Sequence, residues 1–280
     1  MTKFMNCLKP ELSEAEYRSH PAIGSSQVKA LREVPVFLHH EDNPLTVKPD
    51  MHRGTLSHAA TLERLTKSQL AERFPIERRA GWKEEDQENS LFLAQKVHSH
   101  PLISRILKVG KPEVSVFGEL CGVECKGRID WYQDLDDDAK IMVRRKGVPF
   151  AIDSSAVNLY DMKTLGKGMA EQEAFMKYVA NNDLHVQAAF YHDLVQKVLG
   201  SAPARFSWIA VERDPPYMMA VYNAADWLEL GRFEYERNLQ HYRDYLQLKP
   251  EQRESLKFAG YHEDERILPV PAWKMKGIYE

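Results

Sequence analysis

The run NLYDMKTLG at 158–166 constrains the fold of this chain more than any other stretch. It begins with the β-favouring pair Leu159 and Tyr160 and ends at a glycine, so it predicts a short strand that stops at a turn. Side chains two residues apart point to the same face of a strand, so Asp161 and Lys163 share one space. An aspartate can hold Mg²⁺ and a lysine can orient water, although a surface ion pair would explain the same spacing.

Other stretches offer partners for this pair. The run CKGRIDWYQDL predicts a strand that carries Asp130, and two acids on neighbouring strands can share a divalent ion. The run HVQAAFYHDLV has a helical pattern, in which Gln187 and Tyr191 lie four residues apart on one face. In GTLSHAATLE, His58 lies early in a helix predicted from Thr55 to about Leu65. Along the chain these motifs follow in the order Gly-x-x-x-His, Gly-Arg-Ile-Asp, Asp-x-Lys and Gln-x-x-x-Tyr. This combination is much rarer by chance than any one of the motifs.

In this combination the sequence resembles the PD-(D/E)xK nucleases of the RecB type, and most closely the exonuclease domain of RecE, also called exonuclease VIII. The resemblance extends over nearly the whole chain, from YRSHPAIGSSQVKAL at 17–31 through GTLSHAATLE, EVSVF, GRID, DMKT and HVQAAFY to VPAWKMKGIYE at 270–280. It implies a two-metal 5′-to-3′ exonuclease that digests one strand of double-stranded DNA from its ends. It also implies a 3′ overhang for a single-strand-annealing partner of the RecT type in DNA recombination, and a ring-shaped homo-oligomer, a trimer or tetramer.

The resemblance also implies the metal ligands. Asp130, Asp161 and the backbone carbonyl of Met162 would hold one or two Mg²⁺ ions, with help from His58 and Glu113. A neutral imidazole suits Mn²⁺ and tolerates Mg²⁺, so Mn²⁺ is expected to substitute. A satisfied core histidine is the alternative for His58.

Three further residues complete the expected catalytic site. Lys163 would position the attacking water, because nearby cations can lower the pKa of a lysine toward neutrality. Gln187 and Tyr191 would either contact the DNA strand or order the lysine and the acids. Glu119 and Glu124 are additional acids near the predicted strands, with solvent exposure as their alternative.

Contacts with DNA phosphates are expected at two places. Ser25 or Ser26 is the predicted N-cap of a helix that ends at Pro35, and a helix start offers free N–H groups to an anion. The resemblance assigns the 5′-phosphate to this cap, although a plain capped helix explains the serines equally well. Arg128 shares a strand face with Asp130, so it either touches a phosphate or pairs with a nearby acid.

The expected fold class is α/β, with a central mixed sheet of about five strands flanked by helices. Residues 1–16 are expected to be flexible or lightly docked. The helix predicted from 224 to about 246 carries an apolar stripe that is expected to pack on the body. That stripe consists of Trp227, Leu230, Phe233 and Tyr242. The remaining predicted elements are a hairpin at 113–132, two helices within 168–200 that separate near Asn181, and strands at 205–212 and 216–224.

One region departs from the family pattern. Asp161 lies 31 positions after Asp130 (161 − 130), where the family joins the two strands by a short turn. Residues 134–157 are therefore expected to be an insertion. It contains Asp153, a competing strand acid, but Asp161 is preferred because it alone has the Asp-x-Lys spacing followed by a turn.

Composition fits one enzyme domain over residues 1–280, because 280 residues with 43% hydrophobic content can form one large core. No apolar run is long enough for a bilayer, and the first residues are charged where a signal peptide is apolar, so a cytoplasmic location in a bacterial or phage-infected cell is expected. Three cysteines are too few for the four-cysteine iron–sulfur cluster of some RecB-type relatives.

The net charge of −3 argues mildly against a DNA-binding surface, unless basic residues are gathered in a channel. Two alternatives therefore stay open. One is a RecB-like structure-specific or single-strand DNA nuclease. The other is a catalytically inactive DNA-binding module on the same fold.

Overall fold

The computed structural model describes residues 6–32, 49–75, 84–134, 157–256, 265 and 267–269. All but the first and last residue of the predicted insertion at 134–157 lie outside these ranges, and so does Asp153 within it. The predicted helix end at Pro35 and the closing segment 270–280 also lie outside them.

The described part of the chain contains both strands and helices, as expected of an α/β fold. The strands are β1 (Cys7–Lys9), β2 (Lys111–Leu120), β3 (Val123–Gln133), β4 (Asn158–Leu165), β5 (Arg205–Glu212) and β6 (Met219–Asn223). The helices are α1 (Glu14–Ser19), α2 (Ser25–Ala30), α4 (Pro49–Thr61), α5 (Lys67–Arg73), α6 (Glu84–Ser99), α7 (Ile103–Ile106), α9 (Gln172–Asn181), α10 (Leu184–Leu199), α11 (Ala225–Gln247) and α12 (Pro250–Leu256).

Within the described ranges, the strands form one sheet of six in the order β1-β2-β3-β4-β5-β6. Neighbours are antiparallel except β4 and β5, which are parallel and joined through α9 and α10. A parallel pair requires such a crossover, because its strands start at the same edge of the sheet. The predicted mixed sheet is confirmed, with six strands instead of about five.

The additional strand comes from the N-terminal residues. Strand β1 pairs with β2 through Cys7, Leu8 and Lys9. This segment is therefore part of the sheet, whereas a flexible or lightly docked start was expected. A three-residue strand has no alternation that a sequence pattern could detect, since its position depends on an edge that β2 supplies.

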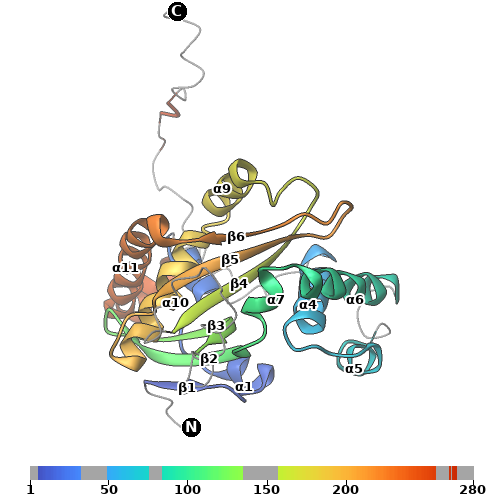
Figure 1. Cartoon of the computed structure of the whole chain (residues 1–280). Helices are drawn as coiled ribbons and strands as arrows, with labels where there is room; N and C mark the ends of the chain where they lie inside the picture. The colour runs from blue at the N-terminus through green and yellow to red at the C-terminus, as the bar shows by residue number, and fades with distance from the viewer. Residues whose placement is uncertain are drawn as a thin grey trace, which may run out of the picture.

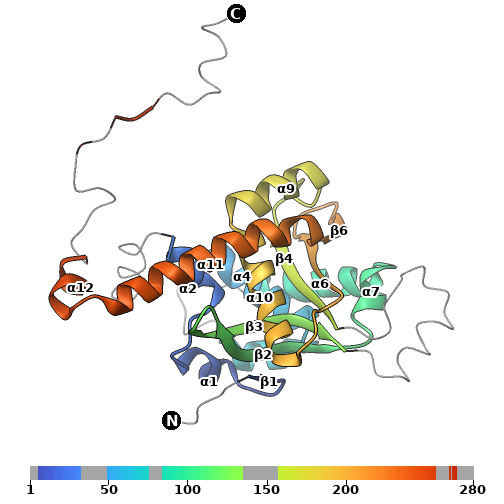
Figure 2. The same ribbon diagram turned by 90° about the vertical axis from the view of Figure 1, so that its left-hand side faces the viewer.

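Helices cover both faces of the sheet (Figure 1). On β4, Leu159 and Leu165 belong to a core cluster with α9, α10 and α11, whereas Tyr160 and Met162 belong to a second cluster with α6 and α7. Figure 2 shows α11 crossing outside α10. A strand buried on both faces in this way is typical of α/β folds.

The stripe predicted on α11 is only half correct. Trp227 and Tyr242 pack against the core, but Leu230 and Phe233 are exposed by 46% and 65%. The buried seam of the helix is formed instead by Gly231, Tyr235, Asn238 and Leu239. Gly231 lets α10 approach closely, because a Cβ there would lie 2.1 Å from the His185 carbonyl oxygen.

Helix boundaries differ from prediction at two places that matter for the site. Helix α4 begins at Pro49 and ends at Thr61, so His58 lies in its last turn and not early in it. Helix α2 has Gly24 as its N-cap, and the Gln27 side chain accepts a hydrogen bond from the Gly24 N–H. Ser25 is therefore the first residue of the helix and not its cap. Within the described ranges, no helix has the length and apolar character needed to cross a bilayer.

Candidate active site

Strands β2 and β3 present two carboxylates side by side. The β2–β3 register pairs Pro112 with Trp131 and Val114 with Ile129, which places Glu113 opposite Asp130. Glu113 itself leaves the ladder, because its backbone has φ = 54°, a conformation that is uncommon for residues other than glycine. Such strain is found preferentially at functional sites, and here it lies beside a candidate metal ligand.

Strands β3 and β4 diverge at the next position. Their pairing ends at Trp131 with Tyr160, so the following pair would be Asp130 and Asp161. Instead of a backbone ladder bond, the Met162 N–H donates to Oδ2 of Asp130 over 2.8 Å. The two aspartates therefore lie where the backbone pairing of the strands ends, and the hydrogen bond fixes the Asp130 side chain.

Asp161, Lys163 and Gln187 form a closed triangle of polar contacts. The Lys163 Nζ lies 2.7 Å from Asp161 Oδ2, so the two side chains share a face of β4 as predicted. Gln187 of α10 donates through Nε2 to Asp161 Oδ1 over 3.1 Å and accepts from Lys163 Nζ over 3.4 Å. Asp161 is 1% exposed, whereas Lys163 and Gln187 are half-buried, so the triangle joins a buried carboxylate to two partly exposed side chains.

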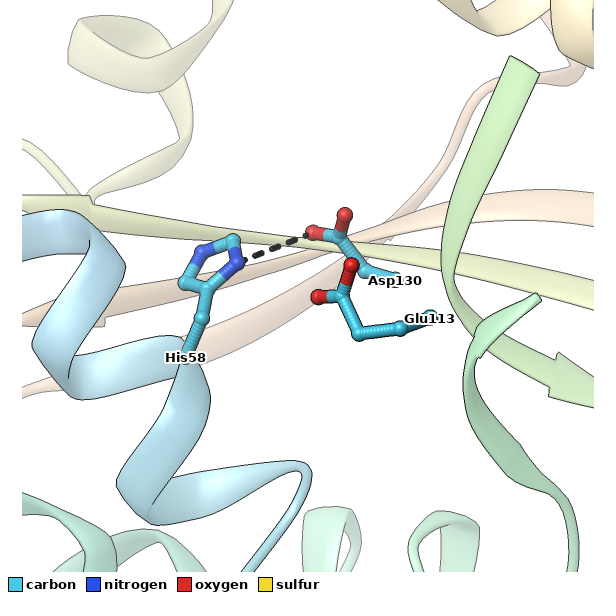
Figure 3. Close-up of side chains that lie close together, drawn as sticks. All are labelled: His58, Glu113 and Asp130. Carbon is cyan, nitrogen blue, oxygen red and sulfur yellow. Dashed lines mark ion pairs between the residues drawn. The ribbon is translucent and has the colours of Figure 1, made fainter. Parts of the chain in front are cut away.

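His58 completes the group from a different direction (Figure 3). It reaches from α4 toward the strands, and its Nδ1 lies 3.5 Å from Asp130 Oδ2. One ligand atom each of His58, Glu113 and Asp130 lies within 4.8 Å of the others. Two carboxylate oxygens and one imidazole nitrogen at this separation form a donor set that fits a divalent ion.

Crowded charge perturbs the ionisation of the site. Burial, and next to it the Asp161 carboxylate, raises the pKa of Asp130 to about 7. Burial acts to lower the pKa of Lys163, but the Asp161 and Asp130 carboxylates outweigh it, so its pKa lies above the ordinary range. A carboxyl group with a raised pKa, held next to a second carboxylate, is a further sign that the group suits a cation.

Arg128 adopts the second of its two predicted roles. Its Nε donates to Glu113 Oε2 over 2.6 Å, and its guanidinium also donates to the Leu12 carbonyl and to Ser115 Oγ. Arg128 therefore holds Glu113 in place. The other two candidate acids, Glu119 and Glu124, face each other at the exposed end of the same hairpin, so solvent exposure is the correct alternative for them.

A cavity of about 380 Å³ is lined in part by His58, Glu113 and Asp130. Seven of the predicted site residues line it: Ser25, Ser26, His58, Glu113, Arg128, Asp130 and Tyr191. The Tyr191 hydroxyl lies 3.1 Å from Ser25 Oγ, so it joins α10 to the start of α2. Burial raises the pKa of Tyr191, which keeps its hydroxyl protonated.

The cavity also contains residues that sequence analysis did not single out. Tyr17, Arg18 and Arg73 belong to its lining, from α1 and α5. Arg18 pairs with Glu14 and Arg73 pairs with Glu63. Tyr17 and Arg18 open the first stretch of the family resemblance, but no spacing within that stretch links them to the acids on the sheet.

Comparison with protein families supports this geometry. Residues 54–257 match a family described as the PDDEXK-like domain of unknown function (DUF3799). The chain belongs to this family. The match includes both aspartates, the lysine and His58 of the candidate site.

The PDDEXK-like chain also resembles a solved structure. A crystal structure of a protein from Eubacterium rectale, named "Putative exonuclease", superposes with a TM-score of 0.62 at 13% sequence identity. The superposition covers 95% of this chain and 97% of the other. It shows that the two chains share a fold, and the family match identifies that fold as PDDEXK-like. No match is found among the curated proteins.

Proposed function

We propose that this PDDEXK-like protein is a metal-dependent deoxyribonuclease. The observation that carries the proposal is the meeting of His58, Glu113 and Asp130 in the lining of one cavity, with the Asp161 and Lys163 pair on the neighbouring strand β4. A surface ion pair would not require a buried aspartate, a strained glutamate and a histidine from another layer.

His58, Glu113, Asp130 and Asp161 would hold the divalent ions, Mg²⁺ or Mn²⁺. Bound there, the ions supply charge for the scissile phosphate and for the departing oxygen. Met162 remains a proposed ligand through its carbonyl, and its N–H orients Asp130.

Lys163 would hold and orient the attacking water. Its side chain is 19% exposed, and its ammonium is kept in position by Asp161 and Gln187. Bound cations would neutralise part of the negative charge of the carboxylates. The electrostatic attraction that raises the pKa of Lys163 would then weaken, so the amine could take part in proton transfer near neutral pH.

The finer proposal follows the resemblance to RecE. The enzyme would degrade double-stranded DNA from 5′ ends and leave 3′ overhangs for a RecT-type annealing protein during recombination, as a trimeric or tetrameric ring in the cytoplasm. Ser25 and Ser26 would seat the 5′-phosphate. Their position supports this role, because Ser25 and Ser26 line the same cavity as Asp130.

Digestion of linear duplex DNA, labelled separately at its 5′ and 3′ ends, tests the proposal. We expect loss of the 5′ label in Mg²⁺, no loss in EDTA, and no loss with Lys163→Ala. Lys177→Ala is a matched control, because Lys177 is an exposed lysine of α9. Loss from single strands only would favour a RecB-like single-strand nuclease. No cleavage by the wild-type protein with Mg²⁺ or Mn²⁺ would contradict the proposal and favour an inactive DNA-binding module.

A further inference from the structure

A second group of metal-binding side chains lies where α9, α10 and α11 meet. Asp183 precedes α10, His185 lies in its first turn, and Glu234 belongs to α11. One ligand atom from each lies within 4.8 Å of the others. The group is separate from the cavity at Asp130, whose lining contains none of the three.

His185 is the most unusual member of this group. It is only 4% exposed, and neither ring nitrogen makes a hydrogen bond within the described part of the chain. Its Nε2 lies 3.3 Å from Glu234 Oε2 without the alignment of a hydrogen bond, and its ring packs near Trp227. A buried polar group in this condition is unfavourable unless it has another partner.

Asp183 is also in an unusual state. It occupies the N-cap position of α10, where an aspartate normally accepts a hydrogen bond from the first turn, but it makes none. Its backbone is left-handed with φ = 49°, which is strained for a residue other than glycine. Its carboxylate lies 3.9 Å from the Arg32 guanidinium and joins His185 and Glu234.

We propose that Asp183, His185 and Glu234 bind one Zn²⁺ ion. Tetrahedral zinc holds nitrogen and oxygen ligands at about 2.0–2.2 Å, which places two of its ligand atoms about 3.3–3.5 Å apart. The His185 to Glu234 distance of 3.3 Å has this value. An imidazole with two carboxylates is a donor set that zinc binds, and water can supply the fourth ligand beside the half-buried acids.

The ion would have a structural role. It would join the start of α10 to α11 at the point where Gly231 packs against the His185 carbonyl. The residue that bonds to Asp161 and Lys163 is Gln187, two positions further along α10. The zinc would therefore fix the end of the helix that orders the candidate active site.

Zinc titration by calorimetry tests this site separately from nuclease activity. The parent protein would carry His58→Ala and Asp130→Ala, which dismantle the first metal-binding group, and would be dialysed against EDTA beforehand. We expect one equivalent of Zn²⁺ to bind, and Glu234→Gln to weaken binding by about tenfold or more. Glu229→Gln, at an exposed position of the same helix, should bind like the parent.

Thermal unfolding provides a second readout. Because a ligand that binds only the folded state raises its stability, Zn²⁺ should raise the Tm of the parent and of Glu229→Gln but not that of Glu234→Gln. Circular dichroism would establish that each variant is folded. Absence of zinc binding to the parent, or equal binding by the two glutamine variants, would overturn the proposal and leave an ordinary His185–Glu234 ion pair.

Discussion

At the scale of single residues, the contacts of Gln187 favour one of its two predicted roles, ordering the lysine and the acids, over contact with the DNA strand. Gln187 does not line the cavity, and it bonds to both Asp161 and Lys163. We therefore expect Gln187→Met to lower kcat by about 10²-fold and to leave KM for DNA unchanged, because the reacting groups lose their alignment while the DNA surface stays intact. Gln196→Met, at an exposed position of the same helix, is the control.

Steady-state kinetics on linear duplex DNA measures this effect. A raised KM with unchanged kcat would instead mean that Gln187 contacts the DNA strand. The sequence motif could not distinguish these roles. A four-residue spacing places Gln187 and Tyr191 on one helix face, but it does not show which residues or ligands that face contacts.

At the scale of elements, the α10–α11 pair depends on one buried carboxylate. Asp193 accepts two hydrogen bonds from Arg232 and one from the Tyr235 hydroxyl, both on α11, and it also contacts the His192 ring. Burial acts to raise its pKa, but the bonds to His192, Arg232 and Tyr235 outweigh it and hold the pKa at about 2. We expect Asp193→Asn to lower the free energy of unfolding by about 2 kcal/mol at pH 7.

The effect should depend on pH in a defined direction. Because the folded-state pKa of Asp193 lies below the ordinary value of 3.8, its contribution is fully present above about pH 4 and is lost as pH falls toward 2. Urea unfolding of wild type and Asp193→Asn at pH 7 and pH 3 should show a smaller difference at pH 3. Asp244→Asn, at an exposed position of α11, should change stability by less than about 0.5 kcal/mol. An equal loss in both variants would refute the role of the Asp193 contacts.

The same scale shows which elements the sequence could predict. Strand β4, the β2–β3 hairpin, β5 and the division between α9 and α10 all follow local patterns, and each is confirmed. Strand β1 and the exposed positions of α11 do not follow local patterns, because they are determined by tertiary contacts with other elements. The cap of α2 differs for a related reason, since the Gln27 side chain bonds back to Gly24 and leaves Ser25 free to meet Tyr191.

At the scale of the whole molecule, the candidate site is assembled from strands and helices that lie far apart in the sequence. Strand β4 presents its Asp-x-Lys pair toward α10, while α4 brings His58 to Asp130 of β3. Resemblance to a family predicted this meeting, whereas periodicity alone could not, because His58 lies 72 positions before Asp130 (130 − 58) and 103 before Asp161 (161 − 58). Tyr17, Arg18 and Arg73 were missed for the same reason, since only the folded chain brings α1 and α5 to the acids.

The most direct test of a nuclease active site is hydrolysis of linear plasmid DNA by the wild-type protein in Mg²⁺, beside Asp130→Asn and Asp161→Asn. Both variants keep the shape of the side chain but remove the charge that a divalent ion needs. We predict Mg²⁺-dependent cleavage by wild type and a loss of at least about 10³-fold in each variant, with far-UV circular dichroism unchanged. Cleavage at the wild-type rate by either variant, or by wild type in EDTA, would contradict the assignment of these carboxylates to catalysis.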